Sequence, residues 1–248
     1  VEAASNVIAA GAEPLAITDC LNYGDPNDPE IFWELHQSVA GMAEACRVFD
    51  TPVISGNVSL YNENNGRAIH PTPMVGMVGL VKNLDHVIPT AVQHPGDQVY
   101  LVGKTGADFA GSELQKMITG DISGVLNPLD LDQVHTNLTN LLAQMQVGHV
   151  ASAHDLSEGG LGVALSETLF KTELGLVLDL RFLPATQLFS ETPGRLVVTV
   201  PAQHAADFAA ALGDGARLVG TVTNSHWLAA RLADAELNVN VSELQQLW

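Results

Sequence analysis

Hydrophobic residues recur with helical spacing at the start of the chain. Val1, Ala4, Val7 and Ile8 fall on one face of a helix, and Gly11 follows at a position that often ends one. The pattern therefore predicts a helix that is already under way at the first residue, which is not Met. We interpret the chain as a piece of a longer polypeptide, with a processed mature N-terminus as the alternative.

A longer helix is predicted to begin near residue 29. Asn27 or Asp28 can cap it, and Pro29 suits the first helical turn, where no N–H is needed. The apolar positions that follow recur every three or four residues: Ile31, Phe32, Leu35, Val39, Met42 and Cys46.

Short apolar runs on either side of this helix predict strands. Residues 15–18 are expected to form the first, and TPVISGNVSLYNE forms a second that runs into a Gly-Asn loop. The segment PTPMVGMVGLV is apolar at successive positions, which predicts a central strand covered on both faces.

Residues 82–96 contain two Pro and two His without a long periodicity, which indicates a linker. Beyond it, helices are expected at residues 131–145, 160–171 and 202–212. Strands are expected at residues 96–103, 150–153, 174–180 and 196–200, and near Leu218 and Val239. This mixture favours an α+β or mixed α/β fold over a strictly parallel wound sheet, with domains at residues 1–85 and 86–248.

The charge balance excludes several classes of partner. The 248 residues include 10 Lys and Arg against 28 Asp and Glu, a formal net charge of −18. Nucleic acids and anionic membranes are bound through Lys and Arg, so neither is an expected partner. A phosphorylated small substrate fits this charge if a divalent cation bridges the like charges, so we expect any phosphate chemistry to depend on a metal ion.

Cysteine content and hydropathy favour a cytoplasmic protein. Cys20 and Cys46 are the only cysteines and form no CxxC pair, which fits a reducing compartment better than a disulfide framework. The longest uncharged apolar stretch, residues 71–81, is far shorter than the ~20 residues of a membrane span. No positively charged segment precedes an apolar run at the N-terminus, so no secretory signal is predicted.

Two polar segments are predicted where strands end, at residues 19–26 and in SGNVS. Gly56 allows backbone N–H groups to approach an anion, the Asn57 carbonyl oxygen suits a hard cation, and the Ser59 hydroxyl suits a phosphate or sugar oxygen. Neighbouring strands would bring both segments together as a Mg²⁺-phosphate site. The alternative is that both are plain turns, because turns use the same residue types.

A third polar segment, AHDLSEGGLGVALSE, is predicted to join a strand to a helix. Asp155 or Ser157 can cap the helix, and Gly159 and Gly160 allow close packing or anion approach. We interpret His154 as a capping or supporting residue rather than a catalytic one. The other histidines show no metal-ligand spacing.

Four segments in this order carry a family resemblance: TDCLNYGDPNDPE, TPVISGNVSLYNE, PTPMVGMVGLV and HDLSEGGLGVALSE. Together they resemble the phosphoribosylformylglycinamidine synthases, more narrowly the synthetase subunit of the small bacterial type. The resemblance covers essentially the whole chain. It implies an aminoimidazole ribonucleotide synthetase-like fold, in which residues 1–85 are a partial N-terminal α+β domain and residues 86–248 a complete C-terminal α/β domain of the second of two modules.

The resemblance implies an ATP-dependent carbon-nitrogen ligase of de novo purine biosynthesis. In this family ATP phosphorylates the amide oxygen of formylglycinamide ribonucleotide, and ammonia drawn from glutamine displaces the phosphate to give the amidine. The implied partners are a glutaminase subunit, a small bridging subunit and the missing N-terminal half of the same chain. The implied cofactors are ATP and Mg²⁺.

The resemblance also implies site residues. Asp19 and Gly56 match positions that contact ATP, Asn57 matches a Mg²⁺ ligand, and Ser59 matches a contact to formylglycinamide ribonucleotide. The family's general-base His belongs to the first module, so we expect no catalytic residue in this chain and no activity from it alone.

Two further hypotheses remain open at this point. The chain can be a vestigial structural module that supports the catalytic half and docks partner subunits. It can also be a related superfamily member, such as aminoimidazole ribonucleotide synthetase or selenophosphate synthetase, although the long DCLNYGDPNDPE segment argues against this. The pair Thr192-Pro193 departs from the family's usual Ser-Gln, which weakens a ligand role for Glu191.

Overall fold

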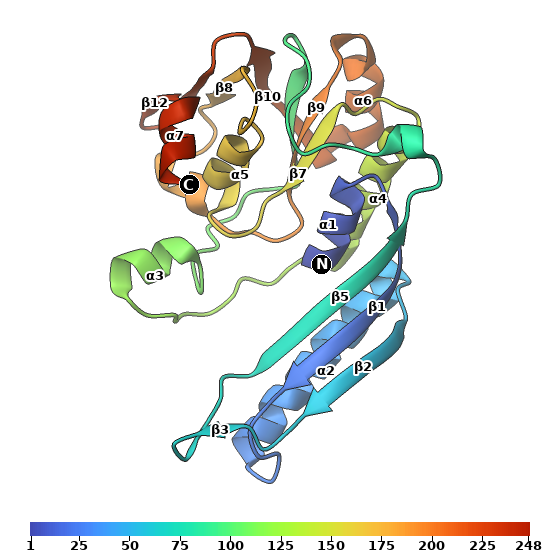
Figure 1. Cartoon of the computed structure of the whole chain (residues 1–248), viewed down its shortest axis with the longest axis vertical. Coiled ribbons are helices and arrows are strands. Elements are labelled where there is room, and N and C mark those ends of the chain that lie inside the picture. The colour runs from blue at the N-terminus through green and yellow to red at the C-terminus, as the bar shows by residue number, and fades with distance from the viewer. The chain divides into compact units, whose positions relative to one another are not determined.

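The computed structural model describes every residue from Val1 to Trp248 and divides into two units. Unit 1 contains Glu13–Leu80 with Val1 and Ala3, and unit 2 contains Val81–Trp248 with Glu2 and Ala4–Ala12. Each unit has its own main sheet, and helices accompany both sheets (Figure 1). The mixed α/β class predicted from the sequence is therefore confirmed.

Unit 1 is built on a three-stranded sheet. β1 (Glu13–Asn22) is its central strand, with β2 (Val53–Ser59) parallel on one side and β5 (Thr72–Leu80) antiparallel on the other. A short hairpin of β3 (Glu63–Asn64) and β4 (Arg67–Ala68) lies between β2 and β5 in the chain.

The helix α2 (Pro29–Phe49) is the crossover that two parallel neighbouring strands require. The Asp28 carboxylate caps it by accepting a hydrogen bond from the Glu30 backbone N–H at 2.9 Å. Asp28 rather than Asn27 is thus the cap, and the predicted helix is confirmed. Phe49 is the only buried residue among its 21, so α2 leaves most of its surface exposed.

Three expectations for unit 1 are wrong. The predicted loop from residue 19 lies within β1 as far as Asn22, because β2 and β5 both pair with that strand to its end. The predicted Gly-Asn loop lies within β2, where Gly56 and Asn57 pair with Asp19 and Cys20. Ladder hydrogen bonds here outweigh the turn preference of Asp, Asn and Gly. The strand predicted to be central, β5, lies at the edge of the sheet with most residues exposed.

Unit 2 is built on a seven-stranded sheet in the order β12-β11-β8-β10-β6-β9-β7. Its pairs are antiparallel except for the parallel pair β8 and β11. The strands are β6 (Gln98–Val102), β7 (Ser152–Asp155), β8 (Gly175–Leu180), β9 (Leu196–Val200), β10 (Ala216–Thr223), β11 (Trp227–Leu232) and β12 (Glu236–Asn240).

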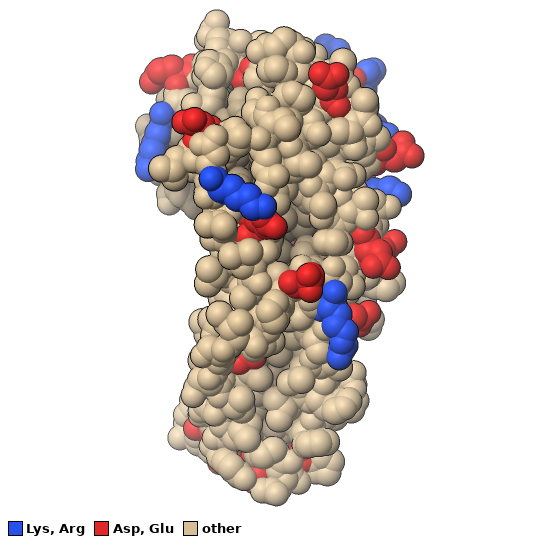
Figure 2. Space-filling model, turned by 90° about the vertical axis from the view of Figure 1, so that its right-hand side faces the viewer, with Lys and Arg blue, Asp and Glu red and all other residues tan.

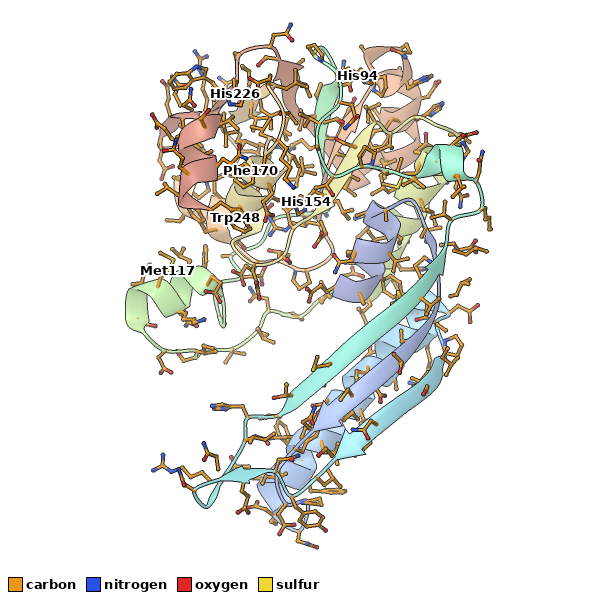
Figure 3. The ribbon with its side chains drawn as sticks, viewed as in Figure 1. His94, Met117, His154, Phe170, His226 and Trp248 are labelled. Carbon is orange, nitrogen blue, oxygen red and sulfur yellow. The ribbon has the colours of Figure 1, made fainter.

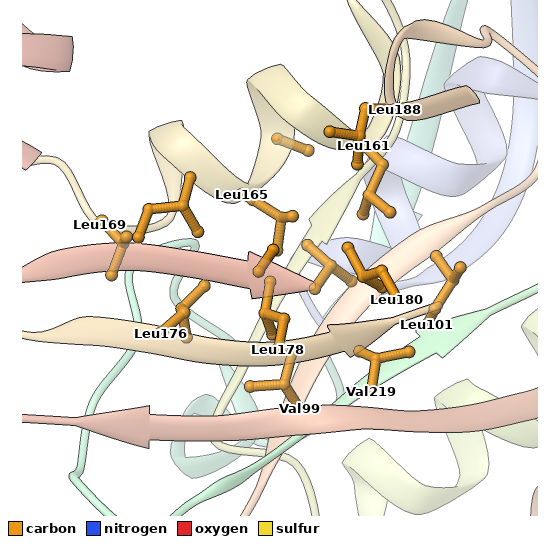
Figure 4. Close-up of a cluster of buried hydrophobic side chains, with 14 of the residues drawn as sticks. Val99, Leu101, Leu161, Leu165, Leu169, Leu176, Leu178, Leu180, Leu188 and Val219 are labelled. Atoms are coloured by element: carbon orange, nitrogen blue, oxygen red, sulfur yellow. The ribbon is translucent and has the colours of Figure 1, made fainter. Parts of the chain in front are cut away.

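Six helices belong to unit 2, and two groups of them bury its core. They are α1 (Glu2–Ala9), α3 (Glu113–Thr119), α4 (Leu131–Gln146), α5 (Gly160–Glu167), α6 (Ala205–Leu212) and α7 (Val241–Leu247). Leu161 and Leu165 of α5 and Leu169 just beyond it pack on Leu178 and other side chains of the sheet (Figure 4). α4 and α6 bury a second set of residues, in which the ring of Phe208 lies 4.9 Å from that of Tyr100 on β6.

The elements predicted for unit 2 are mostly confirmed, with three omissions and one wrong cap. The strand at residues 196–200 matches β9, whereas α5 ends at Glu167, short of its predicted end. β11, α3 and α7 are absent from the prediction. Neither Asp155 nor Ser157 caps α5, because Asp155 is the last residue of β7 and Gly159, with φ of 74°, occupies the cap position.

The linker predicted at residues 82–96 contains one short 3₁₀ turn, Leu84–His86, and no strand. No helix has the length and apolar character to cross a membrane.

Candidate functional site

The residues predicted for the first site are neighbours on β1 and β2. The parallel register pairs Asp19 with Gly56, Cys20 with Asn57, and Asn22 with Ser59. Adjacent strands therefore bring the two polar segments together, as the sequence predicts. Asn57 and Gly56 are exposed, and Asp19 and Ser59 are half-buried.

Asp19 and Gly56 lie on the same face of the sheet and depend on each other. A Cβ atom added to Gly56 would overlap the Asp19 carboxylate, which occupies the space a side chain would need. Gly56 thus leaves room for the Asp19 carboxylate beside the edge strand. The sequence indicates that glycine is special at this position, but the reason lies in its cross-strand neighbour.

Asn57 and Ser59 lie on the opposite face from Asp19 and Gly56, because successive strand residues point to opposite sides. The Asn57 amide nitrogen approaches the Cys20 thiol at 4.0 Å, and the Asn22 amide nitrogen lies 3.7 Å from the same sulfur. The Asn57 amide oxygen accepts no hydrogen bond within the chain. This face therefore has four polar side chains from two neighbouring strands: Cys20 and Asn22 of β1, and Asn57 and Ser59 of β2.

Sequence reasoning missed part of this polar face. Asn62 exchanges hydrogen bonds with Ser59: the Ser59 hydroxyl donates to Asn62 Oδ1 at 3.2 Å, and the Asn62 amide donates to the Ser59 carbonyl at 3.0 Å. Cys20 and Asn22 were missed because the strand was ended too early. The alternation in TDCLN places both on the face of Asn57 once β1 continues to residue 22.

The donor set of this chain is too small to hold a metal ion alone. No group of three or more His, Cys, Asp or Glu lies close enough together. Mg²⁺ takes six oxygen ligands, some of them water or phosphate. The Asn57 amide oxygen can supply one ligand of such a shell, so the residues fit a magnesium ion only as part of a larger site.

In unit 2, His154 is held by two carboxyl-bearing neighbours. Its Nε2 lies 3.0 Å from Glu167 Oε2, and its Nδ1 lies 2.6 Å from the Asp155 carbonyl oxygen. Burial disfavours the charged ring, but hydrogen bonding and charge attraction from Asp155 and Glu167 outweigh burial and raise the pKa of His154. Both ring nitrogens are occupied, which supports the interpretation of His154 as a supporting residue.

Glu191 makes structural hydrogen bonds within unit 2. Its Oε1 accepts hydrogen bonds from the backbone N–H groups of Gly159 at 2.8 Å and Glu113 at 3.0 Å, and so joins three loops. Thr192, the departure noted in the sequence, accepts a hydrogen bond from the Gly106 N–H at 2.9 Å and bonds the Asp108 carboxylate.

Arg195 holds the same loops in place and is almost completely buried. Its guanidinium donates to the carbonyl oxygens of Thr192 at 2.9 Å and Ser190 at 2.5 Å, and to the Thr105 hydroxyl at 3.0 Å. Burial lowers the pKa of Arg195 to about 10, although Asp108 and Glu191 favour its charge. Hydrogen bonds within unit 2 therefore hold these loops together, and we call them the loop cluster: residues 105–113, 157–160 and 190–195.

Two cavities of unit 2 are weaker candidates for a site. The cavity at this loop cluster, lined by Ser5, Asp155 and Glu191 among others, measures 170 Å³, below the ~300 Å³ of typical ligand pockets. Another cavity of unit 2, of 570 Å³, lies over β8, β11 and β12. Its Asp179 is engaged by Arg181 at 2.8 and 2.5 Å, which lowers the pKa of Asp179 to about 2. No group there is placed for catalysis.

The chain matches two family descriptions. Residues 1–81 match "AIR synthase related protein, N-terminal domain" and residues 94–232 match "AIR synthase related protein, C-terminal domain". A curated relative, phosphoribosylformylglycinamidine synthase subunit PurL of Limosilactobacillus reuteri, is 69% identical over 248 residues, which are 100% of this chain and 33% of the relative. The chain thus spans about a third of the length of the curated relatives it matches.

Solved structures from Thermotoga maritima share the fold. "T. maritima PurL complexed with FGAR" has a TM-score of 0.74 and 22% identity, covering 96% of this chain and 40% of that one. "T. maritima PurL complexed with ATP" has a TM-score of 0.68 and 21% identity, covering 98% and 40%. "Structure of PurLQS from Thermotoga maritima" has a TM-score of 0.72 and 20% identity, covering 96% and 39%.

Proposed function

Because this chain belongs to the family of AIR synthase related proteins, we propose that it is one part of an ATP-dependent carbon-nitrogen ligase. The reaction converts formylglycinamide ribonucleotide and ammonia to formylglycinamidine ribonucleotide in purine biosynthesis. The observation that carries the proposal is 69% identity, across the whole chain, to a relative named phosphoribosylformylglycinamidine synthase subunit. The neighbours described with FGAR and with ATP support the choice of substrate and nucleotide.

Within this proposal, the edge of the unit 1 sheet is one wall of the site. Asp19 and Gly56 contact ATP on one face, and Ser59 contacts formylglycinamide ribonucleotide on the other. β2 is the edge strand, so ligands at that edge can reach Gly56 from one face and Ser59 from the other. The hydroxyl of Ser59 is held by Asn62, which fixes its direction before the substrate binds.

Asn57 is the residue proposed to meet Mg²⁺. A bound Mg²⁺ supplies neutralisation of phosphate charge, which a chain of net charge −18 cannot supply by itself. The amide oxygen of Asn57 is free to turn toward such an ion, since its amide nitrogen faces Cys20. In this proposal the chain contributes alignment rather than proton transfer, because the general base is expected in the part of the polypeptide outside this chain.

The remaining part of the polypeptide completes the site. Exposed apolar residues on both edge strands support a covering partner, among them Met74, Val78 and Leu80 of β5 and Val53 of β2. On the face of unit 1 that Figure 2 shows, few side chains are charged. Ammonia comes from a glutaminase subunit joined through a small bridging subunit, and the PurLQS description of a neighbour supports such an assembly. The two free cysteines fit a cytoplasmic location.

The proposal is tested by Asn57→Ala in the full-length polypeptide. We expect turnover with formylglycinamide ribonucleotide, ATP, ammonium and Mg²⁺ to fall by about a hundredfold, the usual scale for losing one charge-stabilising group. The thermal midpoint should change little, because the Asn57 side chain makes only a long contact within this chain, 4.0 Å to the Cys20 sulfur. Asn64→Ala, an exposed asparagine in the β3 hairpin, is the matched control and should keep full turnover. Near-normal turnover of the Asn57 variant would overturn the site assignment.

A second candidate function is a structural module that supports the catalytic half and docks partner subunits. The exposed apolar face of unit 1 and the tightly locked loops of unit 2 favour it. Under this alternative, Asp19→Ala and Asn57→Ala leave turnover intact, while substitutions of exposed apolar residues on β5 weaken the assembly. The two functions therefore predict opposite outcomes for the same pair of variants.

A further inference from the structure

One stretch of ten residues in unit 2 has five large apolar side chains that are exposed to solvent. They belong to α3 and the turn that follows it, residues 113–126, which we call the α3 segment. Their exposed fractions run from 66% to 90%: Met117, Ile118, Ile122, Val125 and Leu126. No residue of α3 is buried, and Figure 3 shows Met117 on this helix, away from the sheet of unit 2.

The α3 segment is ordered by its own hydrogen bonds. Ser112 caps the helix by accepting from the Gln115 N–H at 3.2 Å, and Gly120 ends it in the left-handed conformation. The Gln115 side chain then closes the turn: its oxygen accepts from the Gly111 N–H at 2.8 Å, and its nitrogen donates to the Ser123 carbonyl at 2.9 Å. The apolar side chains are therefore presented on a defined backbone rather than on a loose loop.

Both ends of the segment are tied to the body of unit 2. The Glu113 N–H donates to Glu191 at 3.0 Å, and the Asn127 amide donates to Asp108 Oδ1 at 2.7 Å. These are the loops that Arg195 and Thr192 hold in place. An apolar surface on such a fixed base is pre-organised to bind, because little conformational freedom remains to be lost.

The charge and composition of the segment fit a permanent rather than a transient interface. Its one basic residue, Lys116, is paired with Glu113 at 3.3 Å on the other side of the helix from Ile118. Asp121 is the only charged residue from Met117 to Leu126, so the segment carries little charge to steer a diffusing partner. Permanent interfaces are more apolar than transient ones and resemble a domain core cut in two.

We propose that the α3 segment is a docking surface for the part of the full-length polypeptide that this chain does not include. This chain is 33% of the length of its relative, so about two thirds of the polypeptide is available to cover it. An apolar surface covered by another part of the same polypeptide is not exposed to solvent in the folded protein, so five large apolar residues can be tolerated together. The inference uses the length of the relatives and not the proposed reaction.

The experiment uses the full-length polypeptide with its native cysteines replaced by serine and one new cysteine introduced at a time. Ile118→Cys and Val125→Cys report on the apolar group, and Lys116→Cys, on the other side of the helix from Ile118, is the matched control. In the native protein, we expect the thiols at positions 118 and 125 to react with a maleimide at least tenfold more slowly than the thiol at position 116. In urea the three should react at similar rates. Equal native rates at all three positions would overturn the proposal.

A photo-crosslinker attached at position 118 then identifies the segment that docks on the α3 segment. The proposal expects crosslinked peptides from outside these 248 residues, within the same polypeptide. Peptides from within the 248 residues, from a second copy or from another subunit would each contradict it. Turnover is not part of either readout, so failure of the proposed reaction and failure of this docking surface are separate results.

Discussion

The two units of this chain bury their sheets to very different degrees. In unit 2, side chains of β6 and β8 pack in one core with α5, and all five residues of β9 are buried. Unit 1 has one helix for three strands, and six of the seven residues of β2 are exposed. The same chain therefore contains one unit with a closed core and one with an open sheet.

Under the proposed function, this difference makes unit 1 one wall of a shared site. A sheet needs cover on its apolar face, and unit 2 obtains it from its own helices. Unit 1 exposes apolar residues on both edge strands beside the polar group of Asn57, Ser59, Cys20 and Asn22. One wall of a shared site needs exposed apolar surface beside polar side chains, and unit 1 has both. In unit 2 the exposed apolar surface is the α3 segment.

The largest effect that sharpens this comparison is on stability. Leu165→Ala empties a position that is 2% exposed in unit 2, and we expect a loss of about 3 kcal/mol in the free energy of unfolding. Val78→Ala in unit 1, where the side chain is 56% exposed, should cost less than about 1 kcal/mol in this chain. Urea unfolding monitored by circular dichroism measures both.

The same pair should behave differently in the full-length polypeptide. If the missing part covers the unit 1 sheet, Val78 becomes buried there and its truncation should cost about 1 to 3 kcal/mol. An equally small cost in both contexts would show that the face stays open. Leu165→Ala serves as the control, since its cost should be the same in both.

A smaller difference in stability is expected between alanine substitutions at two glycines of unit 1. Gly56→Ala places a methyl group against the Asp19 carboxylate, so we expect a loss of about 1–3 kcal/mol together with weaker ATP binding by the full-length polypeptide. Gly41→Ala, within α2, meets nothing within 4 Å and should stabilise the chain by up to about 1 kcal/mol. Thermal unfolding and nucleotide titration distinguish them. A Gly56 variant that unfolds and binds like the parent would remove the role assigned to this close approach.

The smallest predicted effect is the pH dependence due to His154 in unit 2. Asp155 and Glu167 raise its pKa above the ordinary 6.5 despite burial, so the folded state binds the proton more tightly than the unfolded state does. The resulting stability is fully present below pH 6.5 and is lost as the pH rises through the folded pKa. Urea midpoints between pH 5.5 and about 8.5 should reveal this loss, and Glu167→Gln should reduce it. An unchanged profile in that variant would contradict the assigned cause.

The sequence predicted helices better than it predicted the ends of strands. α2 was found with its cap because Asp28, Pro29 and the apolar spacing all agree. The sequence predicts that this strand ends at residue 18, because Asp19 and Asn22 favour turns. Pairing with β2 and β5 extends β1 to Asn22. The α3 helix was missed because it has seven residues and no buried face, so it lacks the periodicity that marks a helix.

Part of the candidate site was also predictable and part was not. Gly56, Asn57 and Ser59 stand out by residue type, and their proximity to Asp19 follows from adjacent strands. Which of these residues share a face of the sheet depends on the pairing register of the strands. A segment predicted as a loop has no pairing register, so the faces could not be predicted. Cys20, Asn22 and Asn62 became visible only when β1 and the turn after β2 were seen together.

The most direct test of an incomplete site is ATP consumption with formylglycinamide ribonucleotide, ammonium and Mg²⁺. It is measured first with this chain alone and then after mixing it with the remaining part of the polypeptide. The account predicts turnover only in the mixture, because unit 1 supplies one wall and no catalytic residue. Turnover by this chain alone, or the absence of turnover from a folded and associated mixture, would contradict it.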